Sequence, residues 1–188
     1  MWRNLPMLLT WARIAMIPVL VGIDFLPNAE MSPHDKNVWQ GALFVIAAVT
    51  DYFDGFLARR YQLVTRLGAF LDPVADKLMV CAALILLVNQ HRIGVLITLI
   101  IIGREIGITA LREWMSQIGK RDAVSVHWLG KAKANAQMAA IALLLWHDPL
   151  FEVNVVLIGH MLAVTAAVLT VWSAGHYLWL AAPHLREK

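Results

Sequence analysis

Four aspartates lie within long apolar stretches of this chain, and they constrain its fold more than any other feature. They are Asp51, Asp54, Asp72 and Asp76. Carboxylates inside membrane segments are costly and usually mark a working site. The first two are spaced i,i+3 and the last two i,i+4, so each pair lies on one face of a helix. Clustered carboxylates repel one another unless cations join them, and oxygen ligands suit hard ions, so the pattern predicts a divalent-metal site.

The composition explains why these carboxylates lie in a membrane. Of the 188 residues, 60% are hydrophobic and 15% are charged, and the mean hydropathy is +0.64. Six apolar stretches are long enough for helices that cross a core of about 30 Å. They cover approximately 5–27, 37–59, 71–90, 92–115, 131–147 and 154–182. With no repeat or linker to divide it, the chain is predicted to be one all-α integral membrane domain covering residues 1–188.

The charges orient the six predicted spans. With six spans, both termini and the connections 60–70 and 116–130 share one side of the membrane. Of the sixteen Lys and Arg, all except Lys36 and Arg92 lie on that side or in the adjacent helix ends. By the positive-inside rule this side is cytoplasmic. We therefore expect both termini, and the site formed by the aspartates, to face the cytoplasm.

The second predicted span combines the first aspartate pair with residues suited to a phosphate ligand. Gly55 and Ala58 leave room for a ligand or another helix to approach the backbone closely. Arg59 supplies a planar, permanently charged fork that matches phosphate oxygens. This end of the span therefore predicts a phosphate site beside the carboxylates.

The third predicted span begins at the second aspartate pair. Asp72 is followed by Pro73, a sequence that predicts Asp72 as the helix cap and Pro73 as the first helical residue. Asp76 then lies one turn further along the helix. Two helix ends thus bring two carboxylate pairs together, and a metal pair held there would polarise phosphoryl oxygens. The pattern predicts phosphoryl-type transfer.

At eight positions the segment matches D-x-x-D-G-x-x-A-R, eight residues, then G-x-x-x-D-x-x-x-D. These positions are Asp51, Asp54, Gly55, Ala58, Arg59, Gly68, Asp72 and Asp76. In this motif the chain resembles the CDP-alcohol phosphatidyltransferases, and the resemblance extends over nearly the whole chain. The segments REIGITALREWM and GKRDAVSVHWLGKAKANAQM resemble bacterial members that use glycerol 3-phosphate. One departure is Met7, which stands where relatives often have asparagine.

The resemblance implies a fold and a reaction. The fold is six transmembrane helices around a polar cavity open to the cytoplasm, usually as a homodimer in the bacterial inner membrane, with no nucleic-acid partner. The reaction moves the phosphatidyl group of CDP-diacylglycerol onto sn-glycerol 3-phosphate and releases CMP. By analogy the four aspartates hold two divalent ions, Mg²⁺ or Mn²⁺, and Asp76 takes the acceptor proton. Gly55, Ala58, Arg59 and Gly68 would bind the CDP-diacylglycerol.

Basic residues further along the chain are candidates for the acceptor's phosphate. Arg104 and Arg112 are eight residues apart, roughly two helical turns, and so share one face. Lys131 and Lys133 begin the fifth predicted span. The four could hold a phosphate away from the metal-bound diphosphate. Glu105 pairs with one of these basic residues or orients it.

Two other functions are compatible with the sequence. The first keeps the enzyme class with another acceptor: inositol phosphate, serine, choline, or phosphatidylglycerol, the last giving cardiolipin. The four basic residues favour an acceptor that carries a phosphate. The second is a cation transporter that binds ions at the aspartates. The gathering of the acids at one membrane face and the lack of an inverted repeat count against it.

Overall fold

The computed structural model describes residues 5–61, 66–119, 128–150 and 153–185. Within these ranges the side chains of 5–6, 54–61, 66, 69, 128–132, 180–181 and 183–185 lie outside the description. The described chain forms six helices: α1 (Leu5–Phe25), α2 (Pro33–Tyr61), α3 (Arg66–Asn89), α4 (Val95–Gln117), α5 (Trp128–Trp146) and α6 (Val155–Leu185). The all-α prediction is confirmed, and each predicted span corresponds to one helix.

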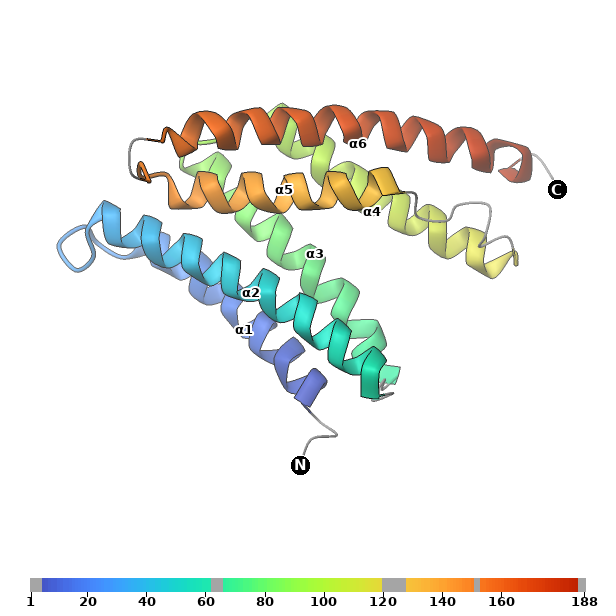
Figure 1. Cartoon of the computed structure of the whole chain (residues 1–188), viewed down its shortest axis with the longest axis horizontal. Helices are drawn as coiled ribbons and strands as arrows, with labels where there is room; N and C mark the ends of the chain where they lie inside the picture. Colours follow the sequence, from blue (N-terminus) through green and yellow to red (C-terminus); the bar gives the residue numbers. More distant parts are fainter. Residues whose placement is uncertain (1–4, 62–65, 120–127, 151–152, 186–188) are drawn as a thin grey trace.

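The helices form two groups, α1 to α3 and α4 to α6, and α5 contacts both (Figure 1). In one group α1 packs along α2 and crosses α3, and in the other α6 packs along α5 and against α4. α5 joins the groups because it also contacts α2 and α3. The start of α1, the end of α2 and the start of α3 lie at the same end of the bundle (Figure 1). The aspartate-bearing segments of α2 and α3 therefore meet at that end.

Small residues let α5 approach its neighbours closely. A Cβ atom added at Gly41 of α2 would lie 3.2 Å from the Cα of Trp146, and one added at Gly159 of α6 would lie 2.9 Å from the side chain of Leu144. Glycine at these contacts lets helices pack with their backbones close together. Leu144 and Leu145 are consequently 0% exposed, at the centre of the apolar core.

The outer surface is strongly apolar. On α6 alone, Val164, Val168, Trp172 and Trp179 are each at least half exposed. Two helices, over Met7–Phe25 and Val155–Trp179, are long and apolar enough by composition to cross a membrane. Exposed apolar patches of this extent are rare on soluble monomers. The surface is therefore consistent with a membrane protein.

The predicted start of the third helix is wrong. α3 begins at Arg66, so Asp72 lies inside the helix and Pro73 is an interior proline. Asp72 is therefore not the cap of the helix. Its carboxylate instead accepts a hydrogen bond from Thr10 of α1 at 2.5 Å. Neighbouring helices commonly make an interior proline tolerable in such bundles. Packing against α1 thus outweighs the local preference for a helix start.

α3 ends in a Schellman motif at His91. The N–H of His91 donates to the carbonyl of Val88 at 3.0 Å, and the N–H of Arg92 donates to that of Leu87 at 2.8 Å. His91 adopts the left-handed conformation, with φ of 56°. The turn directs Arg92 back onto the bundle, where its guanidinium donates to two carbonyl oxygens at the end of α5, at 3.0 and 3.1 Å.

A polar network ties the helix ends opposite the aspartates. The Arg92 guanidinium donates to Asn37 of α2 at 2.5 Å, and the Asn37 amide donates to both oxygens of Asp148, just after α5, at 3.2 Å. Gln90, just after α3, donates to Asp24 of α1 at 2.7 Å. Side chains from the ends of four helices and their flanking turns are therefore joined by direct hydrogen bonds.

Candidate active site

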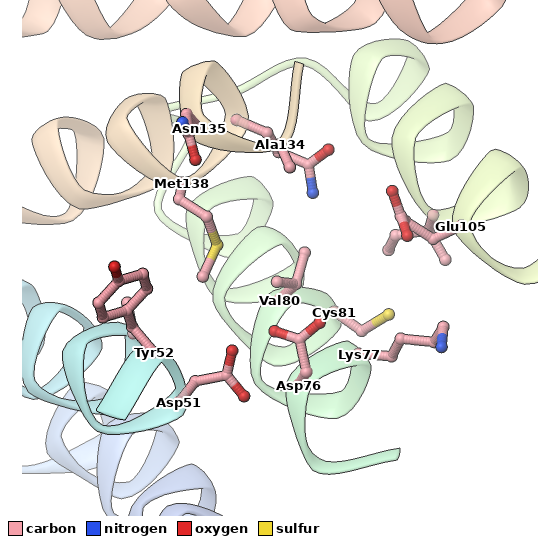
Figure 2. A pocket seen from close by; sticks show the side chains of 13 residues that line it. Asp51, Tyr52, Asp76, Lys77, Val80, Cys81, Glu105, Ala134, Asn135 and Met138 are labelled. Atoms are coloured by element: carbon pink, nitrogen blue, oxygen red, sulfur yellow. The ribbon is translucent and has the colours of Figure 1, made fainter. Parts of the chain in front are cut away.

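A cavity of about 360 Å³ lies between α2, α3, α4 and α5 (Figure 2). Three carboxylates from different helices line it: Asp51 of α2, Asp76 of α3 and Glu105 of α4. α5 contributes the amides of Asn135 and Gln137. The cavity thus brings together residues that are far apart in the sequence and are rich in oxygen ligands.

The carboxylates of Asp51 and Asp76 face one another across this space (Figure 2). Within the part of the chain that the structure describes, Asp76 has no hydrogen-bond or ion-pair partner. Asp51 accepts a hydrogen bond from the Nη1 of Arg13 at 2.5 Å. Two converging carboxylates, one of them with no direct hydrogen-bond or ion-pair partner among the described residues, repel each other and favour a cation between them. These residues fit a divalent metal ion.

α1 supports two of the four aspartates from behind the cavity. Arg13 holds Asp51, and Thr10 donates to Asp72 from three residues earlier on the same helix. Both donors are 1% exposed. Neither Thr10 nor Arg13 is a site residue predicted from the sequence. The position of Arg13 in the middle of the first apolar stretch indicates that it has a partner, because an unpaired arginine at that depth is costly.

Of the three predicted aspartates whose side chains the structure describes, two line the cavity. Asp51 and Asp76 share the cavity, whereas Asp72 bonds to α1. Among the described side chains, no three acidic, histidine or cysteine residues are grouped to hold a metal ion. The side chain of Asp54 lies outside the described residues. The four-carboxylate metal centre therefore stays a prediction.

The predicted donor-binding residues lie where α2 ends and α3 begins. α2 continues as helix to Tyr61, which places the backbones of Gly55, Ala58 and Arg59 on its last turns. Their side-chain surroundings, like those of Lys131 at the start of α5, lie outside the description. Gly68 is buried near the start of α3.

A buried ionic cluster adjoins the cavity. Lys133, only 2% exposed, donates to Oε1 of Glu105 at 2.9 Å, and Arg104 donates to the same oxygen at 3.0 Å. The pairing of Glu105 with basic neighbours is confirmed. Two cations around one carboxylate leave a net positive charge beside the cavity, a suitable environment for an anion.

Arg104 and Arg112 share one face of α4, as their spacing predicts, and in the structure this face contacts α6. Arg112 donates to the hydroxyl of Tyr177 at 3.0 Å, and its Cζ lies 5.1 Å from the centre of that ring. Arg104 makes a longer contact with the hydroxyl of Ser173, at 3.5 Å. Ser173 and Tyr177 are one turn apart on α6, so the two arginines lie along one stripe of the α4–α6 contact.

These helices and the motif define a membrane transferase class. The chain belongs to the CDP-alcohol phosphatidyltransferase family, which it matches over residues 3–172, and the predicted family is confirmed. Proteins of Escherichia coli (strain K12), Shigella flexneri serotype 5b and Salmonella choleraesuis are each 47% identical to it over 188 residues. The alignments cover 98% of this chain and 98% of each relative. All three relatives are named CDP-diacylglycerol–glycerol-3-phosphate 3-phosphatidyltransferase.

Proposed function

We propose that the protein transfers the phosphatidyl group of CDP-diacylglycerol to sn-glycerol 3-phosphate, giving phosphatidylglycerophosphate and CMP. One observation carries the proposal: the cavity where Asp51 and Asp76 face each other adjoins the cationic cluster around Glu105. The cavity between Asp51 and Asp76 suits a metal-bound diphosphate, and the cationic cluster suits the phosphate of the acceptor. The names of the relatives support the same reaction.

The four aspartates hold two divalent ions, Mg²⁺ or Mn²⁺. When bound, such ions neutralise the diphosphate and polarise its phosphorus–oxygen bonds. The carboxylate of Asp76 supports this assignment, because it lies opposite Asp51 and has no direct hydrogen-bond or ion-pair partner among the described residues. Arg13 and Thr10 keep two of the ligand side chains in place from α1. Asp54 and Asp72 complete the ligand set from the same two helices, α2 and α3.

The donor's nucleotide lies beside the last turns of α2. Gly55 and Ala58 follow Asp51 by four and seven residues, so they continue its stripe along the helix towards Tyr61. The lack of bulky side chains there leaves room for the cytidine. Arg59 binds the diphosphate with its guanidinium fork, and Gly68 lets the start of α3 approach.

The acceptor's phosphate binds to Arg104, Arg112, Lys131 and Lys133. Burial of Lys133 and the net positive charge around Glu105 support an anion site at this place. An acceptor held there presents its hydroxyl towards the cavity, since Glu105 lines both regions. A neutral acceptor would lack the phosphate oxygens that form charge-assisted hydrogen bonds with these cations, and such bonds are about twice as strong as hydrogen bonds between neutral groups.

Asp76 acts as the general base. Its carboxylate takes the proton of the acceptor hydroxyl, whose oxygen then bonds to the phosphorus that carries the diacylglycerol. The bond from this phosphorus to the bridging oxygen breaks, and CMP leaves with the electron pair. Because Asp76 has no other hydrogen-bond or ion-pair partner among the described residues, its oxygens are available to the acceptor.

In the membrane, the six helices span the bilayer with both termini in the cytoplasm, as a homodimer in the bacterial inner membrane. The apolar outer surface supports the embedding. The concentration of Lys and Arg beside the aspartate end supports the orientation. The site must in either case open to an aqueous side, because glycerol 3-phosphate is a water-soluble acceptor.

The test is the dependence of CMP release on the acceptor. Protein purified in detergent with Mg²⁺ should release CMP from CDP-diacylglycerol only when glycerol 3-phosphate is present. Inositol phosphate and phosphatidylglycerol, supplied separately, should give no comparable release. Equal release without any acceptor, or faster release with one of the other acceptors, would contradict the proposed reaction.

A further inference from the structure

One side chain that lines the cavity is buried and lacks a polar partner. Gln137 of α5 is 5% exposed, and its Oε1 has no hydrogen-bond partner in the described part of the chain. Several other buried polar atoms of the described residues are unpartnered, but only this one belongs to a residue that lines the cavity. A buried amide oxygen without a partner is costly, so its place beside a cavity indicates a ligand that completes its hydrogen bonds.

Gln137 lies next to the proposed acceptor site. Lys133 is four residues earlier on α5, so the two side chains share one face of the helix, about 6 Å apart along its axis at 1.5 Å per residue. Lys133 donates to Glu105, which lines the same cavity as Gln137. Asp76, the proposed base, lines that cavity too. Gln137 therefore shares one cavity with the cationic cluster proposed for the acceptor's phosphate and with the base proposed for its proton.

Glycerol 3-phosphate has one polar group besides the two that these residues engage. Its phosphate binds the cationic cluster and its 1-hydroxyl reacts, while its 2-hydroxyl is on the carbon between them. A carboxamide can donate a hydrogen bond to a hydroxyl or accept one from it, and it carries no charge. The amide of Gln137 is therefore suited to a hydroxyl that takes no part in the reaction and must keep its proton.

We propose that the terminal amide of Gln137 hydrogen-bonds the 2-hydroxyl of the acceptor and makes the enzyme selective for glycerol 3-phosphate over phosphorylated alcohols that lack this hydroxyl. This inference rests on the proposed function. The acceptor is held at three points: its phosphate by the cationic cluster, its 1-hydroxyl by Asp76 and its 2-hydroxyl by Gln137. Three contacts from different helices fix its orientation, so the 1-hydroxyl is aligned with the phosphorus. Gln137 determines specificity and transfers no proton.

The test removes each partner of this hydrogen bond in turn. 3-Hydroxypropyl phosphate is glycerol 3-phosphate without the 2-hydroxyl, and Gln137→Met keeps the length of the side chain without its amide. CMP release from CDP-diacylglycerol in detergent with Mg²⁺ is measured for both proteins with both acceptors. The wild type should have a kcat/KM for glycerol 3-phosphate roughly tenfold or more above that for 3-hydroxypropyl phosphate. Gln137→Met should bring this ratio close to one by losing activity with glycerol 3-phosphate alone.

The matched control is Gln117→Met. Gln117 is exposed at the end of α4 and is not among the residues that line the described cavity, so this variant makes the same side-chain change elsewhere. Its ratio between the two acceptors should equal that of the wild type. Turnover of 3-hydroxypropyl phosphate by Gln137→Met at the wild-type rate shows that this variant is folded.

A second variant covers the case in which Gln137→Met does not fold. Gln137→Asn keeps an amide in the interior but withdraws it by one methylene, so it should also lower the ratio. A folded variant with the wild-type ratio, an equal loss with both acceptors, or a wild type that uses both acceptors equally well would overturn the role of Gln137. Wild-type protein that releases no CMP with glycerol 3-phosphate would instead overturn the proposed function.

Discussion

Arg13 of α1 donates to Asp51 of α2 at 2.5 Å, although the arginine is only 1% exposed and the aspartate is 40% exposed. The ion pair therefore lies between the interior of the bundle and the cavity. α1 contributes no side chain to the described cavity lining, yet through this pair it fixes a carboxylate that does. A buried charge needs such a partner, since an unpaired one is strongly destabilising.

Removing this guanidinium should make folding depend on the metal. Arg13→Ala leaves Asp51 facing Asp76 without its cation, at a cost of about 1–3 kcal/mol. We expect a lower Tm for this variant in EDTA, and a larger gain in Tm on adding Mg²⁺ than the wild type shows, because a bound ion replaces the missing charge. Thermal unfolding in detergent measures both values. Arg13→Lys, which keeps the charge, is the control, and equal Mg²⁺ gains for all three proteins would contradict the prediction.

The other proposed metal ligands should be required for transfer. Asp54→Asn or Asp72→Asn removes one anionic ligand while keeping the shape of the side chain, so we expect inserted, folded protein with almost no CMP release. The check is CMP release at saturating Mg²⁺ or Mn²⁺, alongside the elution profile of the detergent-purified protein. Near-normal turnover by either variant would remove that aspartate from the metal site.

Asp76 should affect the chemical step more than donor binding. Asp76→Asn should lose kcat by about 10²–10⁴-fold as a missing base, with a further loss from the missing ligand. Donor binding, measured separately, should persist. Asp76→Glu keeps the charge but moves the base by one methylene, and we expect it to be nearly as inactive, because reacting geometries tolerate little displacement. A wild-type kcat for Asp76→Asn would show that another group accepts the proton.

Substitutions in the proposed acceptor and donor regions of the site should change the KM values of different substrates. Lys133→Ala or Arg104→Ala should raise the KM for glycerol 3-phosphate by about tenfold or more, since an unmade charged hydrogen bond costs a few kcal/mol. Arg59→Ala should instead raise the KM for CDP-diacylglycerol. Equal effects of both kinds of variant on both substrates would mean that this division of the site is incorrect.

The end of α3 offers a prediction about stability alone. His91 has φ of 56°, a conformation that costs an L residue with a Cβ atom roughly 1 kcal/mol or more and suits glycine. His91→Gly should therefore raise the Tm by about 2–4 °C. His91→Ala removes the same ring but keeps the Cβ atom, so it should not produce this gain. A lower Tm for the glycine variant would show that the His91 ring itself stabilises the turn.

The existence of the six helices could be predicted from the sequence because each lies in a long apolar stretch. The shared face of Arg104 and Arg112 could be predicted too, since the helical period depends only on spacing. Helix boundaries were less predictable. The Asp72–Pro73 pair favours a helix start locally, but the contact of Asp72 with Thr10, 62 residues earlier, lies inside a helix that begins at Arg66.

The support of the site from α1 could not be predicted from spacing. Arg13 and Asp51 are 38 residues apart, and no periodicity relates them. The sequence places Arg13 among the cytoplasmic charges and in a family pattern that it shares with Thr10, but only the packing of α1 along α2 shows which carboxylate it holds. The same holds for Lys133 and Glu105, which are 28 residues apart: the sequence predicts that Glu105 pairs with a basic neighbour, while the fold selects which ones.

The hydrogen-bonded network of Arg92, Asn37 and Asp148 has a mechanical consequence. It fixes the ends of α2, α3 and α5 that lie farthest from the aspartates, so those ends act as a pivot. Asn37 and Asp51 lie 14 residues apart on α2, which is about 21 Å at 1.5 Å per residue. A tilt of α2 by about 5° at the Asn37 end would move Asp51 by about 2 Å at this helical rise and leave Asn37 almost in place. A substitution at Asn37 is therefore expected to shift Asp51, although the two residues lie at opposite ends of the contact between α2 and its neighbours.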